Sequence, residues 1–251
     1  MTMRHTSAAV AAAALMLTVL AAPAAPAQAA PSPEAQATAI LEAAGVRGGL
    51  VVHLGCADGR VTAALRTSDA YLVHGLDADP NHVAKARAHV LEKGLYGPVS
   101  IDRLGGNRLP YADDLVDLVV AEALGPVPMD EVLRVLAPGG VAYVRSGDGW
   151  TKTVKPWPEE IDTWTHFLHG PDNNAVARDR RVGPPRRLRW WAGPRWCRSH
   201  EFISSFVAMV SGGGRVFYVF DEGLTGVTDA RLPEKWVLIG HDAFNGVRLW
   251  K

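Results

Sequence analysis

Apolar runs and amphipathic stretches alternate along the first part of the chain and predict alternating strands and helices. Continuous apolar runs predict five buried strands, at 49–54, 70–76, 99–103, 115–121 and 141–144. The stretches around them predict helices at 33–44, 59–65, 80–93 and 129–136. Strands that are apolar throughout are typical of a parallel sheet covered on both faces, so we expect a Rossmann-like, doubly wound α/β domain over 31–148. Ligands bind such sheets at the carboxyl ends of the strands.

The pattern changes after about residue 148. A segment rich in Pro, Arg and Trp, 149–200, reads as a bridge, and all eight tryptophans lie beyond residue 148. Four short strand-like runs follow within 201–251, at 206–210, 215–220, 236–241 and 247–250. The first two flank SGGG and the last two flank DAFNG, as in hairpins. Four antiparallel strands in about 45 residues match one propeller blade in size. A propeller needs several blades, so we expect a partial propeller, partner blades or an oligomer.

The first 30 residues predict a secretory signal peptide. Arg4 and His5 precede an apolar run from Ala8 to Ala22, and Ala27 to Ala29 offer a small-x-small cleavage site. The run is shorter than the ~20 residues that span a bilayer. We expect cleavage near Ala29 or Ala30 and an exported protein, periplasmic or secreted, with no membrane span afterwards. An uncleaved membrane anchor is the alternative.

The net charge and the cysteine content limit which kinds of ligand and which covalent or metal links the sequence supports. The formal net charge is zero, so nothing draws the whole chain toward nucleic acid or anionic lipid. An Arg-rich run at 178–198 interleaves with tryptophans. This pattern suits base stacking, but in an exported protein we expect it to pack within a domain interface or to bind anionic glycans. We expect free thiols at Cys56 and Cys197, and no metal at the closely spaced His166 and His169.

The segment VVHLGCADG, 51–59, carries the main chemical signal. An apolar strand ends in small residues at Gly55, Ala57 and Gly59, a pattern that lets a ligand approach bare backbone between a strand and a helix. Asp77 ends the next apolar run, near the spacing of roughly 20 residues expected between a glycine loop and a ribose-binding carboxylate. A helix N-cap is the alternative role for Asp77, although Asp79 before Pro80 suits that role better.

Residues 48–145 resemble the class I S-adenosylmethionine-dependent methyltransferases. VVHLGCADG resembles the loop that holds the methionine part of the cofactor, and VHGLDADP resembles the segment whose acid binds the ribose. NRLPYADDLVDLVV and EVLRVLAPGGVAYV resemble later family segments in the same order. The resemblance implies methyl transfer to an unknown acceptor. The cofactor-binding residues that it implies are His53, Gly55, Cys56, Ala57, Gly59, Asp77 and Ala78.

The chain also departs from the family pattern. His53 stands where the family usually has an acid that holds the cofactor's ammonium group, and a protonated imidazole would repel that charge. Gly105 stands near the position of an acid that contacts the adenine. Only five strands are expected in the sheet, two fewer than in the family. The catalytic base is unknown; Glu122, after the fourth strand, is a candidate, and a solvated surface acid is the alternative.

The last sixteen residues, WVLIGHDAFNGVRLWK, resemble a repeat of pyrroloquinoline-quinone-type β-propellers. The matching residues are Asp242, Ala243, Gly246 and Trp250, the last of which packs between blades in that family. Two alternatives to an active methyltransferase therefore stay open. One is a non-catalytic exported scaffold with a degenerate methyltransferase domain. The other is a fragment of a quinoprotein-like propeller protein.

Overall fold

The computed structural model describes residues 30–181, 183, 188–193, 205–225 and 231–251. The predicted signal peptide and Cys197 lie outside these residues, apart from Ala30. Residues 31–251 form one compact unit. Within the described part of the chain, no helix combines the length and the apolar character that crossing a bilayer requires.

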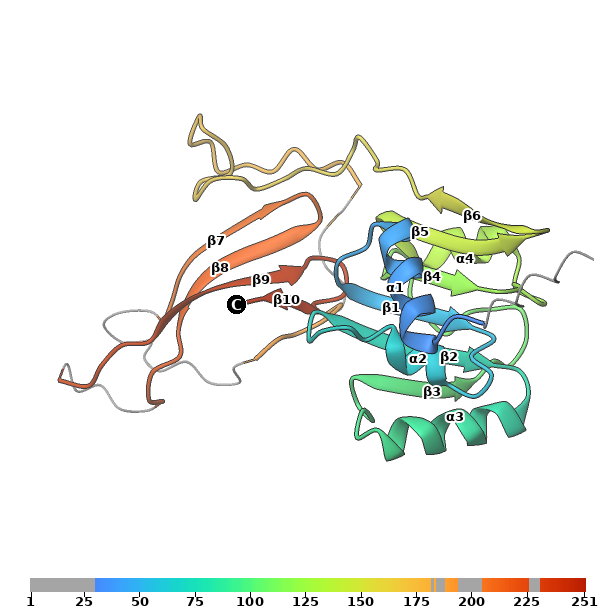
Figure 1. Ribbon diagram of the computed structural model, residues 1–251. Coiled ribbons are helices and arrows are strands. Elements are labelled where there is room, and N and C mark those ends of the chain that lie inside the picture. The colour runs from blue at the N-terminus through green and yellow to red at the C-terminus, as the bar shows by residue number, and fades with distance from the viewer. Residues whose placement is uncertain (1–29, 182, 184–187, 194–204, 226–230) are drawn as a thin grey trace, which may run out of the picture. The chain divides into compact units, whose positions relative to one another are not determined.

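The first sheet has six strands in the order β3-β2-β1-β4-β5-β6 (Figure 1). The first five run parallel, which confirms the predicted Rossmann-like arrangement. Their bounds are β1 Gly49–Leu54, β2 Tyr71–Asp77, β3 Val99–Arg103, β4 Val116–Ala121 and β5 Leu136–Ser146. A sixth strand, β6 Gly149–Val154, runs antiparallel to β5.

The strand β6 corrects the expectation of five strands. Its sequence, GWTKTV, has only exposed and half-buried residues and no continuous apolar run, because it lies at the edge of the sheet. A turn at Gly147, with φ of +59°, returns the chain directly onto β5. The parallel sheet thus continues past residue 148, into the segment assigned to the bridge.

One helix, α1 Pro33–Ala44, precedes β1, and three lie between strands of this sheet: α2 Arg60–Ala64, α3 Pro80–Glu92 and α4 Met129–Val135. Two begin at prolines that follow capping side chains. Ser32 Oγ accepts from Ala35 N at 3.2 Å, and Asp79 Oδ1 accepts from Asn81 N at 2.8 Å. The second contact confirms Asp79 as the N-cap of α3.

The parallel sheet has a hydrophobic core on each face. One core joins buried residues of α1, α2 and α3, among them Ile40, Ala63 and Val90, to β1, β2 and β4. The other joins Val132 and Val135 of α4 to the opposite face of the same sheet. All six residues of β1 are buried, so this strand and the loop after it have a fixed position.

The second sheet is an antiparallel meander in the order β10-β9-β8-β7. Its strands are β7 Phe206–Gly212, β8 Arg215–Asp221, β9 Trp236–Asp242 and β10 Arg248–Trp250. Gly213 and Gly214, both at positive φ, make the two-residue turn between β7 and β8, as SGGG predicts. The four strands agree with the sequence prediction, whereas a propeller blade is a finer description that the topology alone does not decide.

Candidate functional site

The loop after β1 lies at the carboxyl edge of the parallel sheet. Gly55 has φ of +73°, and no atom lies within 4 Å of the position that a Cβ would take there. Ala57 is also at positive φ and, like Gly55, is exposed. Backbone without side-chain cover therefore faces open space at this edge, as the small residues of the segment predict.

Asp77, the last residue of β2, ties this loop to the sheet. One carboxylate oxygen accepts from Ala57 N at 3.0 Å, and the other accepts from Asp79 N at 2.9 Å. The side chain is 9% exposed and lies 3.2 Å from Nδ1 of His82. Asp77 does not cap α3, because Asp79 does. Ala78, the next residue, is exposed at the same edge.

His53 is buried beneath the loop. Its Nδ1 lies 2.8 Å from Thr62 Oγ1 on α2, so the ring links β1 to the helix that follows the loop. Burial lowers the pKa of His53 to about 4, against the opposing effect of the negative charges of Glu122 and Asp77. The ring is therefore neutral near pH 7 and adds no positive charge to this edge.

The neighbouring residues have structural roles. Cys56 is a buried free cysteine, and burial raises the pKa of its thiol to about 12, so it is not a reactive thiolate. Gly59 is the N-cap residue of α2 and packs against Ala86 of α3. Gly105 has no side chain, and no atom of another residue lies within 4 Å of the position that a Cβ would take there.

Glu122 follows β4 at the same edge and is half-exposed. Its carboxylate forms an ion pair with Arg145 at the end of β5, at 2.9 Å. Both side chains are close to half exposed, at 56% and 49%. The negative charge of Glu122 is thus paired in this structure, and the position remains open to a molecule bound over the sheet edge.

The histidines of the bridge do not share a helix face. His166 and His169 form an isolated antiparallel bridge, and His169 Nε2 lies 2.7 Å from Asp162 Oδ2. Backbone hydrogen bonding from Arg178 and the contact with His169 lower the pKa of Asp162 to about 2. No group of three metal-ligating side chains occurs in the part of the chain that the structure describes.

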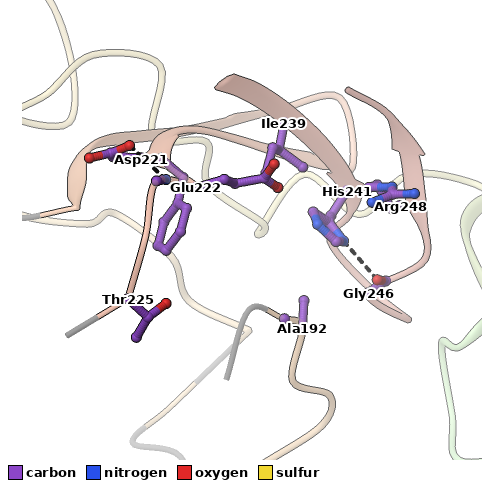
Figure 2. A pocket seen from close by; sticks show the side chains of 11 residues that line it. Ala192, Asp221, Glu222, Thr225, Ile239, His241, Gly246 and Arg248 are labelled. Atoms are coloured by element: carbon purple, nitrogen blue, oxygen red, sulfur yellow. Dashed lines mark hydrogen bonds between the residues drawn. The ribbon is translucent and has the colours of Figure 1, made fainter. Parts of the chain in front are cut away.

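The second sheet carries a cavity of about 590 Å³ over β8 and β9 (Figure 2). Asp221, Glu222 and Arg248 lie around it. Asp221 accepts from the backbone of Gly223 and Lys235, and Glu222 pairs with Lys251. The acids of this cavity are thus engaged by their own strands and turns, and the sequence patterns gave no signal for it.

The comparisons with known proteins concern the first sheet. Residues 51–140 match the family model of a methyltransferase domain. This segment is similar to a methyltransferase domain. It contains the loop, Asp77, Glu122 and all of α4, whereas β6 and the antiparallel sheet lie outside the match.

Individual relatives cover the same region. Methyltransferase GfsG of Streptomyces halstedii is 36% identical over 96 residues, which are 36% of this chain and 34% of the relative. Human methyltransferase-like protein 27 is 34% identical over 97 residues, 37% of this chain and 38% of the relative. The chain thus spans well under half the length of these curated relatives.

A similar solved structure is geranyl diphosphate C-methyltransferase from Streptomyces coelicolor A3(2). It is 19% identical, has a TM-score of 0.41, and matches over 44% of each chain.

Proposed function

We propose that the methyltransferase-type domain binds S-adenosylmethionine at the loop after β1 and transfers its methyl group to an acceptor that the chain does not identify. The open backbone at Gly55, in a loop that Asp77 holds through Ala57 N, carries this proposal. S-adenosylmethionine supplies an electrophilic methyl group on a sulfonium. The residues of this chain would bind and align it, which is the main contribution an enzyme makes to such a displacement.

The residues at the edge fit this cofactor in part. Gly55 and Ala57 leave room for close approach. Oδ2 of Asp77 accepts one backbone N–H and retains a free lone pair for a ribose hydroxyl, whereas Oδ1 is engaged by both Asp79 N and His82 Nδ1. His53 is neutral, so it does not repel an ammonium group. The adenine side lacks an acid, because Gly105 has no side chain. We therefore expect weaker binding than a complete set of contacts would give.

Calorimetry on the full chain with S-adenosylmethionine and S-adenosylhomocysteine tests this proposal. We expect heat of binding, and loss of at least about tenfold in affinity for Asp77→Asn, because a hydrogen bond to a charged group contributes ~1.5–3 kcal/mol. Asp102→Asn is the matched control: it is also a neutralised acid at a strand end, but it contacts His74 and Arg87. Absence of heat at millimolar ligand would support the non-catalytic scaffold instead.

The antiparallel sheet supports a second candidate role. We infer that it is a propeller-type blade completed by partner blades, in a quinoprotein-like protein or an oligomer. Its meander order, the Asp242 turn and Trp250 stacked on Phe217 at 5.7 Å support this. Both Leu238 and Trp236 are exposed, at 52% and 39%. A single monomeric species at all protein concentrations in sedimentation would count against a partner from a second copy.

Export is a further part of the proposal. The sequence of residues 1–30 supports it, with cleavage near Ala29. Mass spectrometry of the protein from a secreting host is expected to find the mature chain starting at Ala30 or Pro31. Retention of the full apolar run in a membrane fraction would support the uncleaved anchor.

A further inference from the structure

The turn after β9 is a rigid projection of the antiparallel sheet. Oδ1 of Asp242 accepts from Phe244 N at 2.8 Å and from Asn245 N at 3.0 Å, and the backbone closes with Gly246 N donating to Asp242 O at 3.0 Å. Such a side-chain-closed turn leaves its central residues in one conformation. Asn245 is therefore held in a fixed position at the tip.

The side chain of Asn245 reaches the parallel sheet. Its amide nitrogen donates to Leu115 O at 3.0 Å and to Asp117 Oδ2 at 2.6 Å. Its own oxygen accepts from Val247 N at 3.0 Å. All the polar atoms of this side chain are engaged, and two of its hydrogen bonds end at the start of β4, 128 and 130 positions earlier in the sequence.

Asp117 receives this contact in a confined space. The same Oδ2 accepts from Leu50 N at 2.7 Å, so the carboxyl group links β1, β4 and the turn. A Cβ at Gly49 would clash with that carboxyl group. The side chain of Asp117 therefore cannot change its position without breaking its hydrogen bond with Leu50 N at the amino end of β1.

A second carboxyl group meets Asp117 there. Asp242 is 7% exposed, and Asn245 bridges the two acids: its backbone N donates to Asp242 Oδ1 at 3.0 Å and its amide nitrogen donates to Asp117 Oδ2 at 2.6 Å. Burial, and then the negative charge of Asp242, raise the pKa of Asp117 well above its usual range. Two carboxyl groups this close cannot both ionise at low cost.

The other charged groups nearby do not neutralise the pair. Arg47, before β1, and Arg215, of β8, line a cavity of about 720 Å³ that Asp117 and Asp242 also line. Neither carboxyl group forms an ion pair within the described residues. His241 of β9 directs its Nδ1 to Gly246 O at 2.8 Å. Lys155, beyond β6, pairs with Asp114 instead.

We propose that Asp117 and Asp242 share one proton, and that the amino end of β4 is a docking site that holds the 242–246 turn only while this proton is present. The occupant is the chain's own antiparallel sheet, through Asn245 and Asp242. This inference is independent of cofactor binding, because the contact lies at the amino ends of the parallel strands and the glycine loop lies at their carboxyl ends.

The direction of the pH effect follows from the shared proton. In the undocked state Asp117 would be solvated and lose its proton near the ordinary value of 3.8. The docked state retains the proton to higher pH, so docking is strongest in acid and weakens as pH rises toward the raised pKa of Asp117. Each pH unit in that interval weakens docking about tenfold.

Hydrogen exchange of the full chain measures the docking directly. We expect peptides covering 236–251 and the amide of Leu50 to exchange faster, after correction for intrinsic rates, from about pH 5 to about pH 9. Asp117→Asn keeps a donor toward Asp242 and removes the titration, so its corrected exchange is expected to be the same at both pH values. Asp148→Asn, an exposed acid in the β5–β6 turn, is the control and keeps the wild-type increase.

A second variant keeps the test decisive if Asp117→Asn does not fold. Asp242→Asn retains the oxygen that closes the turn and removes the neighbouring charge, and it is expected to remove most of the pH dependence. Circular dichroism shows which variants are folded. The proposal is overturned if the corrected exchange of 236–251 in the wild type is constant across this range. It is also overturned if a folded variant at either position keeps the wild-type increase.

Discussion

The two sheets of this chain differ in how far they bury their strands. All residues of β1 and all but one of β4 are buried, whereas no residue of β7 and only the last two of β8 are. Strands of both sheets contain Val and Leu, but aromatic residues gather in the antiparallel sheet, as in β8. The parallel sheet has helices packed on both faces. Apolar runs therefore predict strands, but a covering layer decides how much each strand stabilises the fold.

The largest expected effect comes from the same truncation in each sheet. Leu118 of β4 is fully buried, whereas Leu238 of β9 is 52% exposed. Leu118→Ala is expected to lower the free energy of unfolding by ~2–5 kcal/mol through lost burial and a cavity. Leu238→Ala is expected to change it by less than about 0.5 kcal/mol. Urea unfolding checks both, and equal losses would contradict the comparison.

The buried strands of the parallel sheet were predicted better than its edge strand, because burial on both faces requires an apolar sequence. Buried strands such as β1 and β4 are apolar throughout, so their bounds followed from the sequence to within one residue. The edge strand β6 is half-polar and was missed. It is a strand because Gly147 turns the chain onto β5, a tertiary contact that no local apolar pattern records.

In the candidate site, too, features with a local sequence pattern were predicted, whereas most of those that depend on tertiary contacts were not. Gly55 and Asp77 were predicted because small residues and a strand-terminal acid have a local signature. The link from Asp77 to Ala57 N, and the pairing of Glu122 with Arg145, join residues 20 and 23 positions apart. Asn245 with Asp117 joins the two sheets across 128 positions. The spacing of roughly 20 residues anticipated that Asp77 lies near the loop, whereas the other two pairs depend on the topology and had no signal in the sequence.

The buried imidazole of the parallel sheet provides the next test. The pKa of His53 is about 4 in the folded chain against an ordinary 6.5. Between these values the unfolded chain binds more protons, so stability rises with pH and is lost as pH falls through this interval. The loss is expected to reach roughly 2–3 kcal/mol. His53→Gln, which retains a polar contact for Thr62, is expected to flatten this slope in unfolding measured across pH.

This acid-side loss has the opposite sign to the docking of the turn, which weakens at high pH. The two are therefore separable in one titration. An unchanged acid slope in His53→Gln would show that another group causes it and would remove His53 as the pH-sensitive element of the parallel sheet.

Two glycines of the loop distinguish packing from ligand access. A Cβ at Gly59 would lie 2.8 Å from Cα of Ala86, whereas one at Gly55 meets no atom within 4 Å. Gly59→Ala is expected to destabilise the fold by ~1–3 kcal/mol through overpacking. Gly55→Ala is expected to cost only about 1 kcal/mol, from its left-handed backbone, but to weaken binding of S-adenosylmethionine. Thermal unfolding and calorimetry on both variants check this, and normal binding by a folded Gly55→Ala would place the cofactor elsewhere.

The smallest expected effect on stability is at the exposed end of the parallel sheet. Glu122 and Arg145 are paired but close to half exposed, and such surface pairs contribute little because solvent screens them. Glu122→Gln is expected to leave the unfolding midpoint and S-adenosylmethionine affinity unchanged. If the domain transfers methyl groups, single-turnover rates with an acceptor would fall in this variant only if Glu122 contacts that acceptor. An unchanged rate would assign Glu122 to the solvated surface, because a carboxylate that acts as a base or binds the acceptor loses that role when it is neutralised.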